Sequence, residues 1–421
     1  MRALRDAGHI AYFAGGCVRD ELLGLVPSDY DIATDATPDS IAHLFPRSSH
    51  VGAAFGVMLV HPPGRASKEV IEVATFRTDA SYSDRRRPDS VTFSTPEADA
   101  QRRDFTVNAL YLDPFETPRA GEGPLPAGWG TSGGGRVIDF VGGLADLRAR
   151  TLRAVGVPAQ RLAEDHLRAL RAVRLSAKLS FQIDEATAGA IREHAAELKG
   201  VSRERVGDEL RLMFAHPSRA SAAATLQALA LTGPVLMDAT GRWTAPGGFG
   251  VLGGLATPVP FGVAVAAWGL DLGVDWRQHA IHSEFTDAAR RALCLSNEER
   301  MQVAQSLSGL SFMQSDQEWA AWSVARQKRF AVSEACEAGL LLLSVVNPSA
   351  AARVRARIAD LAQTPAGLAP APILTGDHLV ASGYTPGPKF KALLDAVYDA
   401  QLEGRVTNLE TARELVAKIR V

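Results

Sequence analysis

The sequence predicts an α+β protein in which a small α/β head precedes a much longer all-α remainder. Runs of β-branched and aromatic residues, which are typical of strands, are confined to the first 150 residues. From Pro158 onward, apolar residues recur at helical spacing instead. At 421 residues, 46% of them hydrophobic, the chain is long enough for about two to four domains with buried cores.

We expect the head to contain a five-stranded sheet. The runs with strand character are Ile10–Phe13, Tyr30–Thr34, Phe55–Val60, Val70–Phe76 and Ser90–Ser94. Helical character is predicted for Val18–Leu23 and Glu97–Leu112. The stretch Gly121–Gly135 is rich in Gly and Pro, which predicts a surface loop within the head.

Helical patterns dominate the rest of the chain, beginning with Ala163–Leu179 and Asp184–Leu198. Pro246–Pro260 and Thr364–Pro372 have compositions typical of connectors. We therefore divide the chain into a head, a helical neck, a helical body and a helical tail that binds RNA, which are residues 1–150, 151–215, 216–360 and 361–421.

Composition favours a cytoplasmic protein. The N-terminus lacks an apolar signal segment, and no run of 18 apolar residues occurs, so we expect no membrane association. The three cysteines, Cys17, Cys294 and Cys336, are far apart and predict neither disulfides nor a zinc site. The net charge of −2 argues neither for nor against binding of nucleic acid, but arginines crowd between Arg148 and Arg174. Such runs are commonly solvated faces; beside metal-binding carboxylates they suit a triphosphate and an RNA backbone.

Asp29 and Asp31 lie two residues apart on a predicted strand, so their carboxylates share one face. Two such carboxylates repel unless cations lie between them, and hard oxygen ligands suit Mg²⁺. Glu72, on a later predicted strand, joins them if the two strands are neighbours. Three carboxylates and two metal ions are the parts needed for in-line attack of a hydroxyl on an α-phosphate. Alone, Asp-Tyr-Asp also occurs in metal-dependent glycosyltransferases and in loops without chemistry.

Gly15 and Gly16 follow a strand and precede a helix, a turn that lets backbone N–H groups approach a phosphate. A plain strand-to-helix turn explains the pair equally well. On a helix, Glu164, Asp165, Arg168 and Arg171 would share one polar side. A carboxylate and a guanidinium exposed together can hydrogen-bond the edge of cytosine or adenine. The alternative is an i,i+4 ion pair between Glu164 and Arg168.

These motifs occur in a specific order along the chain. Gly15–Asp20 and Asp29–Asp31 resemble the signature of the polymerase-β-like nucleotidyltransferases, and together with later segments they resemble the class II tRNA nucleotidyltransferase and bacterial poly(A) polymerase family. The later matching segments are Arg102–Ala109, Asp139–Gly143 with Asp146-Leu147, Glu164–Arg171, and Ser202–Arg205 with Glu209. The resemblance covers residues 10–215 strongly and returns weakly near residues 374–388. It implies a polymerase-β-like head.

The resemblance also implies roles for individual residues. Asp29 and Asp31 hold two Mg²⁺ ions, and Glu72 is the third catalytic carboxylate. Asp165 and Arg168 read the base. The implied nucleotide-binding residues are Gly15, Gly16, Arg19, Arg103, Asp104, Asn108, Asp165, Arg168, Arg171 and Arg174. The polar segment with Asp84, Arg86 and Arg87 is similar to the flexible loop that family members use when they switch from CTP to ATP.

The expected activity is therefore template-independent addition of C and A to the 3′ end of tRNA from CTP and ATP, without a stable protein partner. A poly(A) polymerase of the same family is the nearest alternative, although Val51–Val57 looks more like the tRNA-repair branch. An enzyme that adds only CC or only A is a further alternative. A non-catalytic RNA-binding protein would not need Asp29, Asp31 and Glu72. A glycosyltransferase would explain none of the other motifs.

Overall fold

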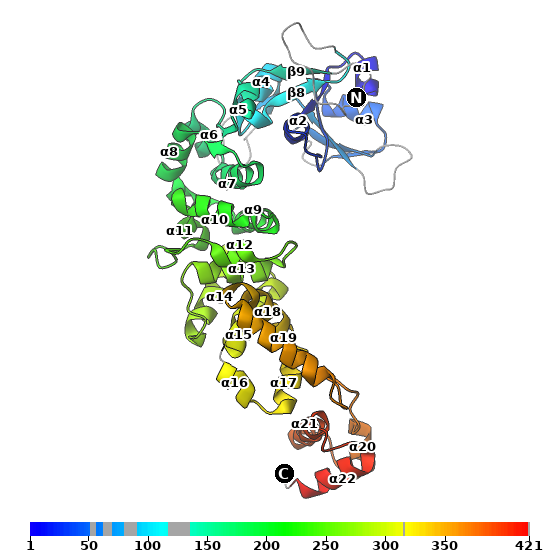
Figure 1. The fold of residues 1–421 in the computed structure, drawn as a ribbon. Helices are drawn as coiled ribbons and strands as arrows, with labels where there is room; N and C mark the ends of the chain where they lie inside the picture. The colour runs from blue at the N-terminus through cyan, green and yellow to red at the C-terminus, as the bar shows by residue number, and fades with distance from the viewer. Residues whose placement is uncertain (51–55, 62–69, 80–90, 117–134, 315, 420–421) are drawn as a thin grey trace. The chain divides into compact units, whose positions relative to one another are not determined.

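The computed structural model describes residues 1–50, 56–61, 70–79, 91–116, 135–314 and 316–419 (Figure 1). The chain forms two compact units. Unit 1 comprises Met1–Glu209 and Ala228–Pro234, and unit 2 comprises Leu210–Gln227 and Val235–Val421. Within the described ranges every strand belongs to unit 1, which confirms the predicted fold class, and every helix is too short or too polar to span a bilayer. The finer division into head, neck, body and tail stays a prediction.

A seven-stranded sheet forms the centre of unit 1. Its order is β3, β4, β5, β2, β1, β8, β9. Strands β2 and β5 are parallel, whereas the other neighbouring strands are antiparallel. The strands are β1 (Ala11–Ala14), β2 (Asp31–Thr34), β3 (Ser48–His50), β4 (Val57–Val60), β5 (Ile71–Thr75), β8 (Leu110–Asp113) and β9 (Arg136–Asp139).

The predicted number of five strands is wrong. Strand β7 (Val91–Phe93), which falls within a predicted run, pairs with β6 (Arg77–Asp79) in a separate two-stranded ribbon. The sheet instead gains β3, β8 and β9. Strand β3 is polar and short, so it carries no apolar signal in the sequence.

The predicted helix Glu97–Leu112 is also wrong beyond its first turns. Helix α4 (Pro96–Gln101) ends early, a 3-10 turn η2 (Thr106–Asn108) follows, and Leu110 already belongs to β8. All four residues of β8 are buried, because the strand lies between β1 and β9. A short, fully apolar run suits a central strand as well as a helix, and periodicity alone does not separate the two.

Both faces of the sheet are covered, as β2 illustrates. Ile32 packs with Leu4 of α1 (Arg2–Asp6) and Ile41 of α3 (Pro38–Leu44) in one apolar cluster. Ala33 packs with Phe76 and Tyr111 in another. Successive strand residues point to opposite faces. Asp31 therefore shares the face of Ala33.

The region after the sheet is helical, but its helices are shorter than the sequence predicts. Residues Ala163–Leu179 divide into α6 (Pro158–Glu164) and α7 (Arg168–Leu179), because the Asp165 carboxylate accepts a hydrogen bond from the Leu167 amide at 3.0 Å and ends the first helix. The other elements here are α2 (Gly16–Leu22), α5 (Gly143–Arg148), the paired β10 (Thr151–Leu152) and β11 (Gln182–Ile183), α8 (Glu185–Glu193), η3 (Ala195–Gly200) and α9 (Arg203–Ala215). The predicted helix Asp184–Leu198 thus changes at His194 into a 3-10 helix.

The remaining described chain is helical. Its helices are α10 (Arg219–Ala228), α11 (Thr232–Leu236), α12 (Gly250–Gly254), α13 (Phe261–Asp271), α14 (His279–Leu293), α15 (Asn297–Gln314), α16 (Asp316–Ala321), α17 (Val324–Ala331), α18 (Glu334–Val346), α19 (Pro348–Ala362), α20 (Gly376–Ala381), α21 (Pro388–Leu402) and α22 (Leu409–Lys418). The predicted connector Pro246–Pro260 contains α12, whose amides at Val251 and Leu252 donate to the Asp271 carboxylate. The last three helices have their own apolar cluster, whereas Thr364–Pro372 contains no helix.

Candidate active site

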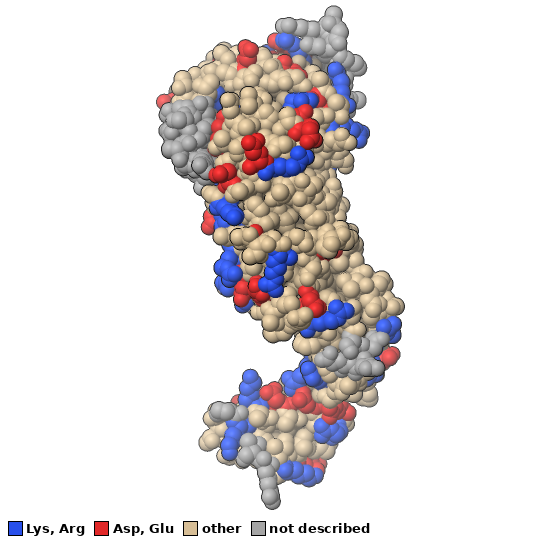
Figure 2. All heavy atoms as spheres, turned by 90° about the vertical axis from the view of Figure 1, so that its left-hand side faces the viewer, with Lys and Arg blue, Asp and Glu red and all other residues tan. Residues whose placement is uncertain are grey.

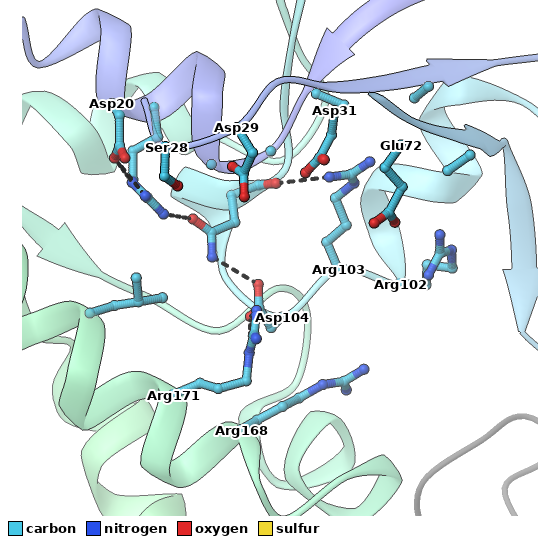
Figure 3. A pocket seen from close by; sticks show the side chains of 18 of the residues that line it. Asp20, Ser28, Asp29, Asp31, Glu72, Arg102, Arg103, Asp104, Arg168 and Arg171 are labelled. Carbon is cyan, nitrogen blue, oxygen red and sulfur yellow. Dashed lines mark hydrogen bonds and ion pairs between the residues drawn. The ribbon is translucent and has the colours of Figure 1, made fainter. Parts of the chain in front are cut away.

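A cavity of about 640 Å³ lies in unit 1 (Figure 3). Its charged lining consists of nine basic side chains, Arg19, Arg77, Arg102, Arg103, Arg168, Arg171, Arg174, Lys178 and Arg205, and six acidic ones, Asp20, Asp29, Asp31, Glu72, Asp104 and Asp165. All predicted catalytic and nucleotide-binding residues line it, since Gly15, Gly16 and Asn108 do so as well. The predicted loop residues Asp84, Arg86 and Arg87 lie outside the described residues.

One face of the molecule offers a comparison for the density of basic side chains. On the face shown in Figure 2, Lys and Arg are interspersed with Asp and Glu and do not gather in one large patch. The concentration of arginines around the cavity therefore sets it apart from that face. A cavity of this size with convergent charged groups is typical of a small-molecule site, and its positive excess suits a polyanion.

The turn between β1 and α2 requires glycine at its first position. Gly15 has a φ of 79°, which is in the left-handed region, and its amide donates to the Leu110 carbonyl at 3.0 Å. A Cβ at this position would lie 3.0 Å from Nη1 of Arg103. The turn thus brings the β1–α2 backbone close to a cationic side chain of the cavity.

The three predicted catalytic carboxylates line the cavity together. Asp31 begins β2, and Asp29 lies just before the strand instead of on it. The parallel register pairs Ile32 with Val73, so Asp31 and Glu72 occupy the preceding positions of neighbouring strands. The sequence predicts this grouping only if β2 and β5 are neighbours, and they are.

The electrostatics of these carboxylates suit a bound cation. Burial, together with the charges of Glu72 and Asp29, raises the pKa of Asp31 to about 6, although Arg103 opposes the shift. Burial and the charge of Asp29 also raise the pKa of Glu72. A cation would relieve this repulsion and stabilise the ionised forms. Across the described residues, however, no three His, Cys, Asp or Glu side chains are close enough together to enclose a metal ion by themselves.

A chain of charged hydrogen bonds runs along the cavity from α2 to α7 (Figure 3). The Arg19 guanidinium donates to Asp20 at 2.5 and 2.7 Å and to the side-chain oxygen of Asn108. Asn108 donates to Asp104 at 3.1 Å, and Arg171 donates to the other Asp104 oxygen at 2.6 and 2.8 Å. Burial alone would raise the pKa of Asp104, but the Arg171 charge and these hydrogen bonds outweigh it and lower that pKa to about 2. Asp104 is thus held as an anion.

Asp99, which sequence reasoning missed, holds two arginines of the cavity. Its side chain is 2% exposed and binds Arg102 through one oxygen, at 2.6 Å, and Arg103 through the other, at 3.0 Å. The Tyr111 hydroxyl also donates to it at 2.7 Å. Burial would raise the pKa of Asp99, but the charges of Arg103 and Arg102 lower it. Asp99 precedes the two arginines by three and four residues, and this helical spacing could have indicated the ion pairs from the sequence.

The sequence predicts that Asp165 and Arg168, the expected base-reading pair, lie on an exposed helix face, and this placement is wrong. Asp165 lies in the break between α6 and α7 and is bound at 2.6 Å by Arg205, and its side chain is 14% exposed. Arg168, 12% exposed, forms an ion pair with Glu164. That pairing is the structural alternative raised from the sequence. Both side chains still line the cavity.

Two further contacts complete this side of the cavity. Arg174 binds Glu209 of α9 at 2.7 Å, and Lys178 lies 3.7 Å from Asp20. Neither Lys178 nor Arg205 was predicted as a site residue. Lys178 follows Arg174 by four residues on α7, so helical spacing could have found it.

This part of the chain combines a mixed sheet, an Asp-x-Asp pair at β2, a third carboxylate on the neighbouring parallel strand and an arginine-lined cavity, an arrangement that suits nucleotidyl transfer. Residues 11–153 match the Poly A polymerase head domain. Residues 180–237 match the probable RNA and SrmB-binding site of polymerase A. Residues 11–153 and 180–237 thus resemble the family of class II tRNA nucleotidyltransferases and bacterial poly(A) polymerases, whose CCA-adding members depend on metal ions.

Several CCA-adding enzymes are similar to this chain. That of Latilactobacillus sakei is 43% identical over 215 residues, which are 51% of this chain and 48% of the relative. That of Limosilactobacillus fermentum is 37% identical over 284 residues, which are 66% of this chain and 63% of the relative. The chain thus spans about half to five-eighths of the length of these relatives. The crystal structure of the Bacillus stearothermophilus CCA-adding enzyme in complex with CTP has a TM-score of 0.75 at 27% identity, covering 99% of this chain and 95% of that one.

Proposed function

We propose that this protein adds C and A nucleotides to the 3′ end of tRNA, using CTP and ATP and releasing pyrophosphate. The observation that carries the proposal is that Asp29, Asp31 and Glu72 line the same cavity as Arg103 and Asp104. The similarity to a CCA-adding enzyme that was crystallised with CTP supports the choice of nucleotide. The three free cysteines support a cytoplasmic setting.

The carboxylates would carry out the transfer step. Asp29 and Asp31 would hold two Mg²⁺ ions, with Glu72 assisting; when bound, the ions lower the pKa of the attacking 3′-hydroxyl and neutralise charge on the leaving group. Arg19 and Arg103 would donate hydrogen bonds to the triphosphate. Because Asp20 and Asp99 fix these guanidinium groups beforehand, little side-chain freedom is lost on binding.

The other side of the cavity would select the base. The Asp165 carboxylate can accept from the exocyclic amine of cytosine or adenine, and Arg168 can donate to ring nitrogen or carbonyl oxygen. Arg171 and Arg174 would contribute further contacts to the nucleotide, Arg171 while bound to Asp104. Uracil and guanine present a carbonyl where cytosine and adenine present the amine, so they would meet the carboxylate with an acceptor.

The proposal is tested with a tRNA transcript that ends at its discriminator base. Incubated with CTP, ATP and Mg²⁺, it should receive CCA, as shown by sequencing the products. Incorporation of UTP or GTP at comparable rates would contradict the proposal. Addition that halts at CC with both nucleotides present would indicate a partial enzyme that works with a separate A-adding partner.

A poly(A) polymerase is the second candidate, favoured by the match of residues 11–153 to the Poly A polymerase head domain. Such an enzyme would extend unstructured RNA with ATP alone. Long A-tails on a single-stranded oligonucleotide, with no C added to truncated tRNA, would support this candidate over CCA addition.

A further inference from the structure

Arg161 of α6 lies outside the lining of the cavity, yet its side chain reaches the segment that carries cavity residues. Its guanidinium donates to the carbonyl of Gln101 at 2.7 Å, to that of Arg102 at 3.2 Å and to that of Val155 at 3.3 Å. The side chain is 15% exposed. Three main-chain carbonyls from two segments are thus held by one planar cation.

These carbonyls adjoin two nucleotide-binding residues proposed above. Gln101 ends α4, Arg102 caps it, and Arg103 and Asp104 follow directly. The Val155 amide in turn donates to the Asp104 carbonyl at 3.2 Å. Arg161 therefore binds the backbone directly before the Arg103-Asp104 pair and, through Val155, is connected to the Asp104 carbonyl.

The same guanidinium is connected to the base-reading side of the cavity. It donates to Oε2 of Glu164 at 2.7 Å, and that oxygen also accepts from Arg168. Nη1 of Arg168 donates in addition to the main-chain carbonyl of Arg161 at 2.7 Å. The orientation of Arg168 is thus set by Glu164 and by the backbone of Arg161.

The backbone does not supply this alignment by itself. Helix α6 ends at Glu164, Asp165 is extended with φ −155° and ψ 104°, and α7 begins only at Arg168. Arg171 ties α7 to Asp104, and the side-chain connection through Arg161 and Glu164 adds a second link, which reaches Arg168 itself.

We propose that Arg161 is a positioning residue that holds Arg168 in register with Arg103 and Asp104, so that base and triphosphate are bound in one productive geometry. The inference rests on the proposed function, since it assigns Arg168 to the base. Selection through hydrogen bonds requires fixed donors, and a misplacement of about 1 Å is enough to cost about 100-fold in rate.

The test compares Arg161→Gln and Arg161→Lys with the control Arg219→Gln in the full chain. Arg219 is a 1% exposed arginine of α10 that likewise donates to three main-chain carbonyls, those of His216, Leu255 and Ala256. Dissociation constants of CTP and UTP are measured without RNA, and kcat and KM are measured with truncated tRNA.

Arg161→Gln should lower the preference for CTP over UTP about 10- to 100-fold and reduce kcat more than it raises KM. Arg161→Lys, which keeps the charge, should recover part of that preference. Arg219→Gln should lower the melting temperature and leave the preference unchanged.

Wild-type preference in folded Arg161→Gln, or an equal loss in Arg219→Gln, would overturn the inference. If Arg161→Gln does not fold, the test depends on Arg161→Lys, and a wild-type preference for CTP over UTP in that variant also overturns the inference. If the wild-type protein transfers no nucleotide, the proposed function is refuted, but a comparison of CTP and UTP dissociation constants between the wild type and Arg161→Gln still tests the role of Arg161. If the wild type binds CTP and UTP with equal dissociation constants, the proposed function and the role of Arg161 are both refuted.

Discussion

Asp31 stands beside Glu72 on the parallel strands β2 and β5, one position before the paired residues Ile32 and Val73. Strands of the same direction bring equivalent ends to the same edge of a sheet, so two carboxylates far apart in the sequence meet here. Asp29 adds a third negative charge from the segment before β2, and all three line one cavity. The sheet topology therefore creates the repulsion that a divalent cation would relieve.

Replacement of Asp29 or Asp31, the proposed metal ligands, should stop the reaction. Asp29→Asn and Asp31→Asn keep the shape of the side chain but remove the charge that holds metal, and each should lower nucleotide incorporation at least about 1000-fold. Incorporation of labelled CTP into truncated tRNA measures the effect. Asp39→Asn, an exposed carboxylate of α3, is the control and should keep wild-type rates. Substantial transfer by either folded variant would exclude this site.

The negative charge of Asp31 should reduce the stability of the metal-free protein. The raised pKa of Asp31, about 6, means that the folded state holds a proton which the unfolded state releases near pH 4. The free energy of unfolding therefore falls as the pH rises from about 4 to 6 and carries a constant penalty above that. Because Asp31 is partly exposed, we expect a penalty of about 1–2 kcal/mol.

Asp31→Asn should thus raise the melting temperature by about 2–6 °C at pH 7.5 in the presence of a chelator. At pH 5 the difference should shrink, because the folded wild-type protein then holds a proton on Asp31. Thermal unfolding followed by circular dichroism measures both values. A variant that is less stable than wild type at pH 7.5 without metal would show that Asp31 is not under electrostatic strain.

Local sequence patterns are sufficient to predict features that depend only on residues close together in the chain. Gly15, Gly16, Asp29 and Asp31 are identified from short local motifs, and all four line the cavity. Pairing of distant segments is not local. The run at Leu110 is predicted as a helix because burial on both faces of a central strand removes the alternation that identifies strands.

The break at Asp165 illustrates the same limit. Leu167, Leu170 and Val173 repeat at helical spacing and are all buried, a pattern that fits the observed α7 but gives no sign of a break just before it. The break depends on the Asp165 carboxylate, which binds the Leu167 amide and also Arg205, a residue in a later helix. Such a contact is visible only in three dimensions. The buried position of Asp99 is missed for the same reason.

Arg168→Ala should weaken base selection. The side chain is proposed to donate to the base edge, and loss of one such contact costs about 1–3 kcal/mol of discrimination, or about 5- to 150-fold. Rates of CTP and UTP addition to truncated tRNA measure it. Truncation of Arg168 also removes one of the two ion pairs of Glu164 and leaves the pair with Arg161. We therefore expect a modest loss of stability, which truncation of a fully exposed side chain would not cause. Arg192→Ala, which breaks the exposed pair with Glu185, is the control.

Asp99→Asn should act on both nucleotides equally. Asp99 holds Arg102 and Arg103, and Arg103 is proposed to bind the triphosphate, which CTP and ATP share. We expect KM for both to rise about 10-fold while the CTP-to-UTP preference stays at the wild-type value. Asp146→Asn removes another buried carboxylate, paired with Arg153 outside the cavity, and should leave KM unchanged. A changed preference in Asp99→Asn would argue against separate triphosphate and base sides.

The final prediction concerns where addition ends. A tRNA that already carries CCA, incubated with CTP and ATP, should not be extended, whereas the same tRNA without its last A should receive one A. The cavity of about 640 Å³ has room for one bound nucleotide, so each addition must move the new 3′ end out before the next nucleotide enters. A tRNA body held by its shape and backbone charge allows only a limited number of such moves. Gel electrophoresis at single-nucleotide resolution distinguishes the outcomes. Continued addition of A to a complete tRNA would show that the RNA body sets no limit, which is the behaviour expected of a poly(A) polymerase.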